Sequence, residues 1–358
     1  MENDLLYEIA RGPRGRVEQI TAYVPGGTTP PVFDLVYSYR TPSGEEDPTG
    51  NIRAIVAPME PDRDAYYDYD NLDRLVGATG WWGRLDWTYD RTGNRLSETR
   101  LGPGETVPRL SSYAHQSGTS RLTSVTDAST GAAAHVLDYD ASGNATRYDD
   151  LCLIYDQADR LTQVRRLDTP PSSECSTDPC NPTDPRRVER CAPQVVQENT
   201  YDHKFRRTKR VEYVDESGNP IEPFCTGFYY DLQDRLIAEH DCSAARSLDP
   251  AVNVIAEYVY LEGYHVLAVR RGGAWYWYLN DHLPTPRKLV DASRTVVWDG
   301  RMEPFGETDE AVAAVQQPLR MPGQAADPAS RLLYNGDRYI HPEIGRFLAV
   351  DAMASAAV

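Results

Sequence analysis

The sequence YDYDNLDRLVGATG at residues 67–80 returns with variations as WTYDRTGNRLSETR at 87–100, LDYDASGNATRYDD at 137–150 and LIYDQADRLTQVRR at 153–166. Each copy joins an apolar segment that ends in Tyr-Asp, a few turn-forming residues and a second apolar segment. A catalytic site would need such a phrase only once. The repetition therefore indicates an architecture built from similar units.

Each copy predicts a β-hairpin. The tyrosine before the turn stands at a spacing of two from other apolar residues, which is typical of one strand face. The next residue, an aspartate, can accept hydrogen bonds from turn amides, and Gly93 or Gly143 supplies a positive φ angle. A leucine after the turn is expected to resume the buried face. These residues are Tyr69, Tyr89, Tyr139, Tyr155, Tyr201 and Tyr230, then Asp70, Asp90, Asp140, Asp156, Asp202 and Asp231, and finally Leu75, Leu96, Leu161 and Leu236.

The composition also favours an all-β protein. The chain of 358 residues has 23 Tyr against 6 Phe, together with 25 Gly and 26 Pro. Tyrosine suits half-buried strand faces, whereas glycine and proline suit many short turns. Hairpins of this kind predict a long, right-twisted sheet that curves, since the repeats are too irregular for a propeller. The one helix expected is short, in ETDEAVAAVQQ at 307–317.

Charge and hydropathy exclude several classes of function. The net charge of −17 argues against a broad nucleic-acid surface, which would need Lys and Arg to neutralise phosphates. The first residues, MENDLLYEIARGPRGRVEQI, lack the basic start and apolar run of a secretion signal, and no stretch has the apolar length of a membrane span. No phosphate-binding loop, dinucleotide fingerprint or spaced metal-ligand set occurs either, so no cofactor or metal is expected.

Six cysteines occur, of which Cys152, Cys175, Cys180 and Cys191 lie in or near a Cys/Pro-rich insert at about 167–199. Cys225 and Cys242 follow later. Disulfides would form in an oxidising compartment, while free thiols and a zinc site are the alternatives.

From about residue 257 the loose repeat gives way to a definite series of motifs. This series resembles the RHS-repeat-associated core domain of the Rhs/YD-repeat proteins, which include bacterial polymorphic toxins and the C components of Tc toxin complexes. The motifs are NDHLPTPR with Asp281, His282 and Arg287; PFGE with Pro304, Phe305 and Gly306; PGQ with Pro322, Gly323 and Gln324; LYNGDRY with Tyr334, Asn335, Arg338 and Tyr339; and GRFLAVD with Gly345, Arg346, Phe347 and Asp351.

The resemblance implies a cocoon-like shell. A YD-repeat region at 1–256 would spiral around a hollow, and a core domain at 257–358 would turn inward as a plug. In toxin-bearing members of the family the hollow holds a C-terminal polypeptide. The motif residues named above are then expected to have structural roles, with His282 as a packing residue and Arg287 paired with a buried carboxylate.

The resemblance also implies an aspartyl autoprotease that releases the cargo. Asp351 would be one of two catalytic aspartates, because two carboxylates sharing a proton can activate water, and Arg346 would support the pair. In this sequence Ala352 replaces the usual proline, and neither a second aspartate nor a cleavage segment follows. The expected site is therefore incomplete, and the favoured hypothesis is that Asp351 caps a turn in an inert plug.

Aromatic runs suggest a different class of function. Trp275 to Tyr278 alternate on both faces of one expected strand, and Trp82 lies in the similar run WWGRLDW. Such rings can stack on sugars, although a strand covered on both faces is the more ordinary interpretation.

The sequence therefore predicts the shell portion of an Rhs-family secreted protein that encloses or presents a toxin polypeptide and is itself not catalytic. The alternatives are an autoprotease that releases a downstream toxin, and an extracellular carbohydrate-binding adhesion module. The expected partners are the toxin, further shell segments or a secretion or toxin-complex component. The expected location is the exterior or the cell surface by a non-classical route, with a cytoplasmic stage before export.

Overall fold

The structure is a computed structural model and describes residues 4–27, 29–41, 43–167, 179–180, 183–243 and 253–351. Antiparallel strands dominate it, in a 24-stranded sheet and a separate 4-stranded sheet. The predicted all-β class is confirmed. Among the described residues, no helix has the length and apolar character needed to cross a membrane.

The large sheet, which we call the wall, is a meander in which each strand pairs with the next along the chain. Its first strands are β1 (Leu6–Arg11), β2 (Val17–Tyr23), β3 (Phe33–Ser38), β4 (Ala54–Val56), β5 (Ala65–Tyr69), β6 (Leu75–Gly80), β7 (Gly83–Tyr89), β8 (Arg95–Leu101), β9 (Arg109–His115), β10 (Leu122–Asp127), β11 (Ala133–Tyr139) and β12 (Ala145–Tyr148). A 3-10 turn, η1 (Pro61–Arg63), lies between β4 and β5.

The wall continues with β13 (Leu151–Tyr155), β14 (Leu161–Arg166), β15 (Gln194–Tyr201), β16 (Arg207–Val214), β17 (Pro220–Tyr230), β18 (Leu236–Asp241), β19 (Val254–Tyr260), β20 (Val266–Arg271), β21 (Ala274–Asn280), β22 (Pro286–Val290), β23 (Val296–Met302) and β24 (Thr308–Ala313). The plug, residues 314–351, contains β25 (Gln324–Asp327), β26 (Leu332–Asn335), β27 (Arg338–His341) and β28 (Arg346–Phe347). Strand β19 runs through residues 256 and 257 within one continuous sheet. The predicted domain boundary between these two residues stays a prediction.

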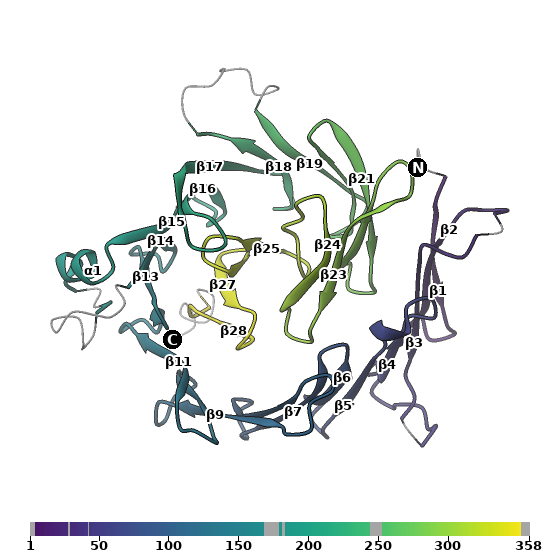
Figure 1. The fold of residues 1–358 in the computed structure, drawn as a ribbon, viewed down its shortest axis with the longest axis horizontal. Coiled ribbons are helices and arrows are strands. Elements are labelled where there is room, and N and C mark those ends of the chain that lie inside the picture. Colours follow the sequence, from purple (N-terminus) through teal and green to yellow (C-terminus); the bar gives the residue numbers. More distant parts are fainter. Residues whose placement is uncertain are drawn as a thin grey trace.

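The wall curves until its two ends meet face to face (Figure 1). Ile20 and Phe33 of the first strands share a buried cluster with Trp277 and Leu279 of β21. The Tyr7 hydroxyl also donates a 2.8 Å hydrogen bond to the carbonyl of Asn280. Figure 1 shows the plug strands β25, β27 and β28 within the resulting ring. The sheet therefore surrounds the plug.

One turn geometry repeats along the wall. In the hairpin of Asp231, its amide donates to the carbonyl of Arg235, and its Oδ1 accepts from the amides of Gln233 and Arg235. The residue three after the aspartate has a positive φ, which glycine adopts freely and other residues adopt at a cost. The residues at this position include Asp73, Gly93, Gly143, Asp159, Phe205, Gly218, Asp234, Pro284 and Arg294, and Gly306 has the same place after Glu303.

A ladder of tyrosines and arginines links neighbouring hairpins. The Tyr201 hydroxyl donates 2.7 Å to the Leu161 carbonyl, and that of Tyr230 donates 2.9 Å to the Arg207 carbonyl. The guanidinium of the preceding turn then stacks on the tyrosine, as Arg160 does on Tyr201 at 5.4 Å from the ring centre. The repeated Tyr-Asp…Arg phrase thus supplies both the turn and the contact between adjacent turns.

Two sequence predictions are wrong. Leu96 does not resume the buried face, and 44% of it is exposed. The residue opposite Tyr89 is Arg95, and Leu96 stands one position later, so its side chain lies on the other face of the strand. The expected helix at 307–317 is also wrong, because β24 occupies Thr308–Ala313 and pairs with β23. Pairing with a neighbouring strand outweighs the helix propensity of its alanines.

The cysteines among the described residues form disulfides. Cys152 pairs with Cys180, and Cys225 pairs with Cys242. Cys191, at the end of helix α1 (Pro185–Cys191), is disulfide-bonded too. Val188 and Ala192 pack with the first of these bridges. Much of the predicted insert at 167–199, including Cys175, lies outside the described residues.

Candidate functional site: the contact between wall and plug

The position that follows the turn faces inward in each YD hairpin of the wall, and in some hairpins it contacts the plug. Leu161 occupies it in one hairpin and is buried, as the sequence predicts. In two other hairpins the same position holds Arg95 and Arg207, which face Tyr89 and Tyr201 across the strand pair. Both arginines are buried, and only 1% of Arg207 is exposed. A buried arginine needs a charged partner. Asp327 of the plug supplies it for Arg207, whereas Glu98 of β8 supplies it for Arg95 at 3.3 Å.

Asp327 of β25 is the partner of Arg207. Its Oδ1 accepts from Nη2 of Arg207 at 2.9 Å and from Nη1 of Arg210 at 2.6 Å, while its Oδ2 contacts Nη1 of Arg207. Gln197 donates a further bond of 2.7 Å to Oδ2. Burial alone would raise the pKa of Asp327, but the two arginines outweigh it and lower that pKa. The plug is therefore held by a buried, fully charged group.

Two plug tyrosines complete this contact. The Tyr334 hydroxyl accepts from the Arg207 amide at 2.8 Å, and the Tyr339 hydroxyl accepts from the Arg207 guanidinium at 2.8 Å. The Tyr334 ring also lies beneath that guanidinium, 4.3 Å from its carbon. Because Tyr334 and Tyr339 come from adjacent plug strands, one arginine of the wall fixes both β26 and β27.

Arg95 occupies the corresponding position on the opposite arc, where it joins two parts of the wall. Its guanidinium lies 4.3 Å from the ring centre of Phe305, in the turn between β23 and β24, and 5.6 Å from that of Trp87. Phe305 and Trp87 meet edge to face at 5.1 Å. Arg100 pairs with Glu303 through two hydrogen bonds of 2.8 Å each. The PFGE motif is thereby tied to β7 and β8.

Histidines form a third contact, between β11–β12 and the plug. His135 Nδ1 lies 2.8 Å from Asp149, and its Nε2 lies 3.3 Å from Glu343 of the plug. Burial would lower the pKa of His135, but the two carboxylates outweigh it and raise that pKa to about 9. His341 stacks on Tyr148 at 4.1 Å, and burial lowers the pKa of His341 to about 4. The cluster therefore combines a charged and a neutral imidazole at neutral pH.

The end of the plug is fixed by its backbone. The Leu348 amide donates to the Tyr339 carbonyl at 2.9 Å, and the Leu348 carbonyl accepts from the Ala145 amide at 2.7 Å. That carbonyl also accepts from the Tyr155 hydroxyl at 3.3 Å. The side chain of Leu348 is buried in the main cluster, against which Tyr139 packs. The Tyr155 hydroxyl thus donates its hydrogen bond to the plug, whereas the hydroxyls of Tyr201 and Tyr230 donate to a neighbouring hairpin.

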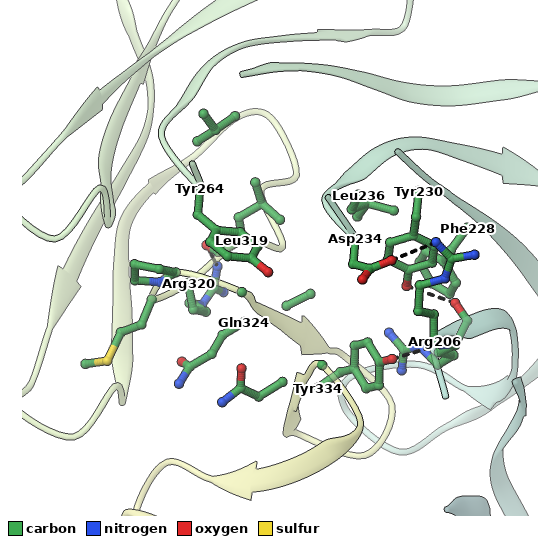
Figure 2. A pocket seen from close by; sticks show the side chains of 18 of the residues that line it. Arg206, Phe228, Tyr230, Asp234, Leu236, Tyr264, Leu319, Arg320, Gln324 and Tyr334 are labelled. Atoms are coloured by element: carbon green, nitrogen blue, oxygen red, sulfur yellow. Dashed lines mark hydrogen bonds and ion pairs between the residues drawn. The ribbon is translucent and has the colours of Figure 1, made fainter. Parts of the chain in front are cut away.

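Two hollows remain between wall and plug. One has a volume of about 730 Å³ and lies between β16–β20 and the plug residues around Gln324 (Figure 2). Figure 2 shows Leu319, Arg320, Tyr264 and Gln324 on one side of it, and Tyr230, Leu236 and Phe228 on the other. The second hollow has a volume of about 1030 Å³. It is lined by the His341–Glu343 turn and by acidic residues of the wall, including some in β24.

The expected catalytic residues have other partners. Asp351 forms an ion pair of 3.3 Å with Arg338, whose guanidinium covers the Phe347 ring at 3.7 Å. Arg346 donates to the carbonyl of Ser120 in the wall. The described contacts thus link Asp351 to Arg338 of the same motif series, and the catalytic assignment stays a prediction.

The NDHLPTPR motif forms one of the repeated turns. Oδ1 of Asp281 accepts from the amides of Leu283 and Thr285, and Arg287 lies 3.8 Å from the same carboxylate. His282 packs edge-on against Tyr37 at 5.0 Å, and burial lowers the pKa of His282. Among the remaining motif residues, Gly323 and Gly336 have positive φ at plug turns, and Asn335 ends β26.

The aromatic runs are mostly covered. Trp277, Tyr278 and Trp82 are buried, whereas 38% of Trp275 is exposed. Tyr276 is partly buried against the cluster that contains Tyr278. These positions match a strand with both faces largely occupied. Sugar binding stays a prediction that would depend chiefly on Trp275.

Sequence reasoning missed Arg207 and Asp327, although a signal was present. Arg207 and Arg95 stand where other copies have leucine, and a charged residue in a leucine position predicts a buried ion pair. Asp327 lies between motifs in PGQAADPASR, without a pattern of its own. Its partnership could be found only from the fold.

Comparison with known proteins agrees with the motif series. Residues 276–311 match the family model described as RHS protein. The double-stranded DNA deaminase toxin A of Burkholderia cenocepacia is 32% identical over 89 residues, and the toxin protein Tse5 of Pseudomonas aeruginosa is 36% identical over 73 residues. These matches cover 24% and 20% of this chain and 6% of each relative. The chain therefore corresponds to a small part of both.

The fold is that of Tc toxin shells. The TcdB2–TccC3 crystal structure aligns with 98% of this chain and 18% of its own, at a TM-score of 0.70 and 18% identity. The Photorhabdus luminescens Tc holotoxin pore structure aligns with 98% of this chain and 17% of its own, at a TM-score of 0.69 and 18% identity. The predicted resemblance to Rhs/YD-repeat and Tc toxin shell proteins is confirmed.

Proposed function

We propose that this Rhs-type chain is the plug-bearing part of a shell that holds a polypeptide on its inner side, and that it acts as a container without catalysing a reaction. The observation that carries this proposal is the attachment of the plug. Arg207 and Asp327 join wall and plug with exposed side-chain fractions of 1% and 0%. Such a contact commits the plug to the inside of the curved sheet.

Two further observations support a container. The hollows of about 730 and 1030 Å³ leave room between wall and plug. The Leu348 contacts fix the last part of the plug to the wall, so any chain that continues beyond it starts from a defined place. The partners we propose are a toxin polypeptide, further shell segments and a secretion or toxin-complex component.

The proposed location is outside the cell. Disulfides such as Cys152–Cys180 and Cys225–Cys242 are typical of proteins that work in oxidising surroundings. The curated relatives are named as toxins, which agrees with an exported protein. Export is a proposal for this chain, to be tested by fractionating the producing cells and their medium.

Protease protection tests the container. A reporter polypeptide without stable structure is fused after Val358, and its digestion by proteinase K is compared with that of the free reporter. We expect the fused reporter to be digested at least about tenfold more slowly, because cleavage requires the shell to open. Equal digestion rates for the fused and free reporter, with the wall itself intact, would contradict the proposal.

A further inference from the structure

The contact at Leu348 shows how this wall binds an extended segment. Tyr155 is the last residue of β13, and its hydroxyl bonds the Leu348 carbonyl, which the Ala145 amide also bonds. The leucine side chain fills the space between hairpins. A tyrosine hydroxyl, a backbone amide and an apolar cluster thus act together to hold a peptide group and its side chain.

Tyr260 has the same place in its own hairpin as the last residue of β19. Its ring lies 5.1 Å from the Arg235 guanidinium, as the ladder requires. Unlike Tyr201 and Tyr230, it makes no hydrogen bond through its hydroxyl to any described residue, and it lines the hollow of about 730 Å³ together with Leu236. The Tyr260 hydroxyl therefore faces a space where its counterpart Tyr155 faces Leu348.

The plug side of this hollow is formed by Gln324 and its neighbours. Figure 2 shows Gln324 beside Arg320, across the space from Tyr230 and Leu236. The Oε1 atom of Gln324 is buried, so it does not reach the space. A hydrogen bond from the Tyr260 hydroxyl to a peptide carbonyl in the hollow would contribute about 1 kcal/mol.

The lining also indicates which side chains fit. Most of it is aromatic or aliphatic, as in Tyr264, Leu319 and Met321. Its arginines are already paired, Arg206 with Asp234 at 2.8 Å and Arg320 with Glu310 at 2.7 Å. An uncharged, apolar segment therefore fits this hollow better than a charged one.

We propose that this hollow is a second binding site for an extended, apolar polypeptide segment, with the Tyr260 hydroxyl bonding its backbone. The site repeats the arrangement at Leu348 and lies along the same series of hairpin ends. Its occupant is a stretch of the enclosed polypeptide, so the inference rests on the proposed function. A volume of about 730 Å³ is within the usual range for binding cavities, roughly 300–1,000 Å³.

Peptide binding to the whole chain tests the proposal. The probe is a fluorescein-labelled peptide of about ten residues that alternates leucine and serine, extended to roughly 35 Å. A peptide that alternates glycine and serine is the matched probe. We expect the leucine peptide to bind more tightly, and Tyr260→Phe to weaken it about fivefold through the loss of one hydrogen bond.

The control is Tyr229→Phe, because Tyr229 is 53% exposed on β17 and does not line the hollow. Its thermal midpoint and that of Tyr260→Phe should equal the wild-type value, which excludes unfolding as the cause. Equal affinity for the two peptides, or equal weakening by Tyr229→Phe and Tyr260→Phe, would overturn the proposal. A dimer of the chain that Tyr260→Phe abolishes would also overturn the proposal, because the hollow would then bind a second copy of the chain.

The two proposals fail separately. If the fused reporter is protected from proteinase K but the leucine peptide does not bind, the container stands and the binding site is wrong. If the peptide binds through Tyr260 but the reporter is not protected, the site is a peptide-binding hollow and the container is wrong.

Discussion

The wall turns and the wall–plug contact use the same pair of side chains in opposite settings. In a turn, Asp231 and Arg235 lie four residues apart, and about a fifth of each side chain is exposed. At the plug, Arg207 and Asp327 lie 120 residues apart, and both are buried. The first pair shapes a local hairpin that water can still reach. The second fixes a distant part of the chain, and water cannot replace either partner.

The difference between these two pairs predicts the largest effect. Asp327→Ala would leave Arg207 buried without a counter-charge, whereas Arg210 would keep Glu212. We therefore expect a loss of about 3–5 kcal/mol in the free energy of unfolding. The control Asp231→Ala removes amide acceptors from an accessible turn and should cost about 1 kcal/mol. Urea denaturation measures both. Equal losses would mean that the buried pair contributes no more than a turn.

A combined variant sharpens this result. Replacing Arg207 by Met together with Asp327→Leu removes both charges of the buried pair and leaves Arg210 paired with Glu212. Because apolar replacement of a buried ion pair is often neutral or stabilising, most of the stability lost in Asp327→Ala should return. If the combined variant is as unstable as Asp327→Ala, the charges themselves specify where the plug sits.

The histidine contact makes the stability of the protein depend on pH. The buried imidazole of His341 accepts a proton more readily in the unfolded chain than in the folded one. The folded pKa of His341 is about 4, below the usual value of 6.5, so the unfolded state binds more protons between these values. Stability must then fall as the pH drops from 6.5 towards 4. Between pH 7 and pH 5, His341 should lower the free energy of unfolding by roughly 2 kcal/mol.

The variant His341→Phe should remove that share while keeping the stacking on Tyr148. The free energy of unfolding should then fall less between pH 7 and pH 5 in the variant than in the wild type. We call this fall the acid loss. The control His203→Phe changes an exposed residue of a wall turn and should leave the wild-type loss unchanged. An acid loss in His341→Phe equal to that of the wild type would contradict the assignment.

A third effect concerns a single wall turn. Pro284 has a φ of +31°, at the position where other turns have Gly93 or Gly143, although the proline ring favours about −65°. Pro284→Gly removes this conflict at the expense of chain entropy, so we expect a gain of about 1 kcal/mol in stability. Thermal unfolding measures it. The opposite change, Gly93→Pro, should destabilise the wall, and a loss in Pro284→Gly would show that the proline is accommodated.

The same contrast explains how far the sequence predicts the molecule. The hairpins could be predicted because their determinants are local: Tyr89, Asp90 and Gly93 lie within five residues and dictate one turn. The register beyond the turn could not, since Leu96 and Arg95 differ by one position and only pairing decides which faces inward. The strand at 308–313 depends equally on a neighbour that its own residues do not reveal.

The site was less predictable than the fold. The motif series indicated Tyr334, Tyr339 and Phe305 as structural residues, but the charges they surround come from Arg207 and Arg95 in the repeats. The pairing of Arg207 with Asp327 depends on how far the wall curves before the plug begins. That curvature is the sum of many small strand twists, which no single motif encodes.

The smallest effect tests the ladder that makes the curvature possible. The hydroxyl of Tyr201 donates to the Leu161 carbonyl, so Tyr201→Phe leaves a carbonyl without this donor and should cost about 1 kcal/mol. Tyr229→Phe changes an exposed hydroxyl and should lie within about 0.5 kcal/mol of the wild type. Tyr155→Phe removes the same kind of bond from Leu348 of the plug. If the ladder and the plug share one mode of attachment, the losses in Tyr201→Phe and Tyr155→Phe agree. A loss confined to Tyr155→Phe would mean that the hairpins hold together through their backbones alone and that the tyrosine serves only to bind extended segments.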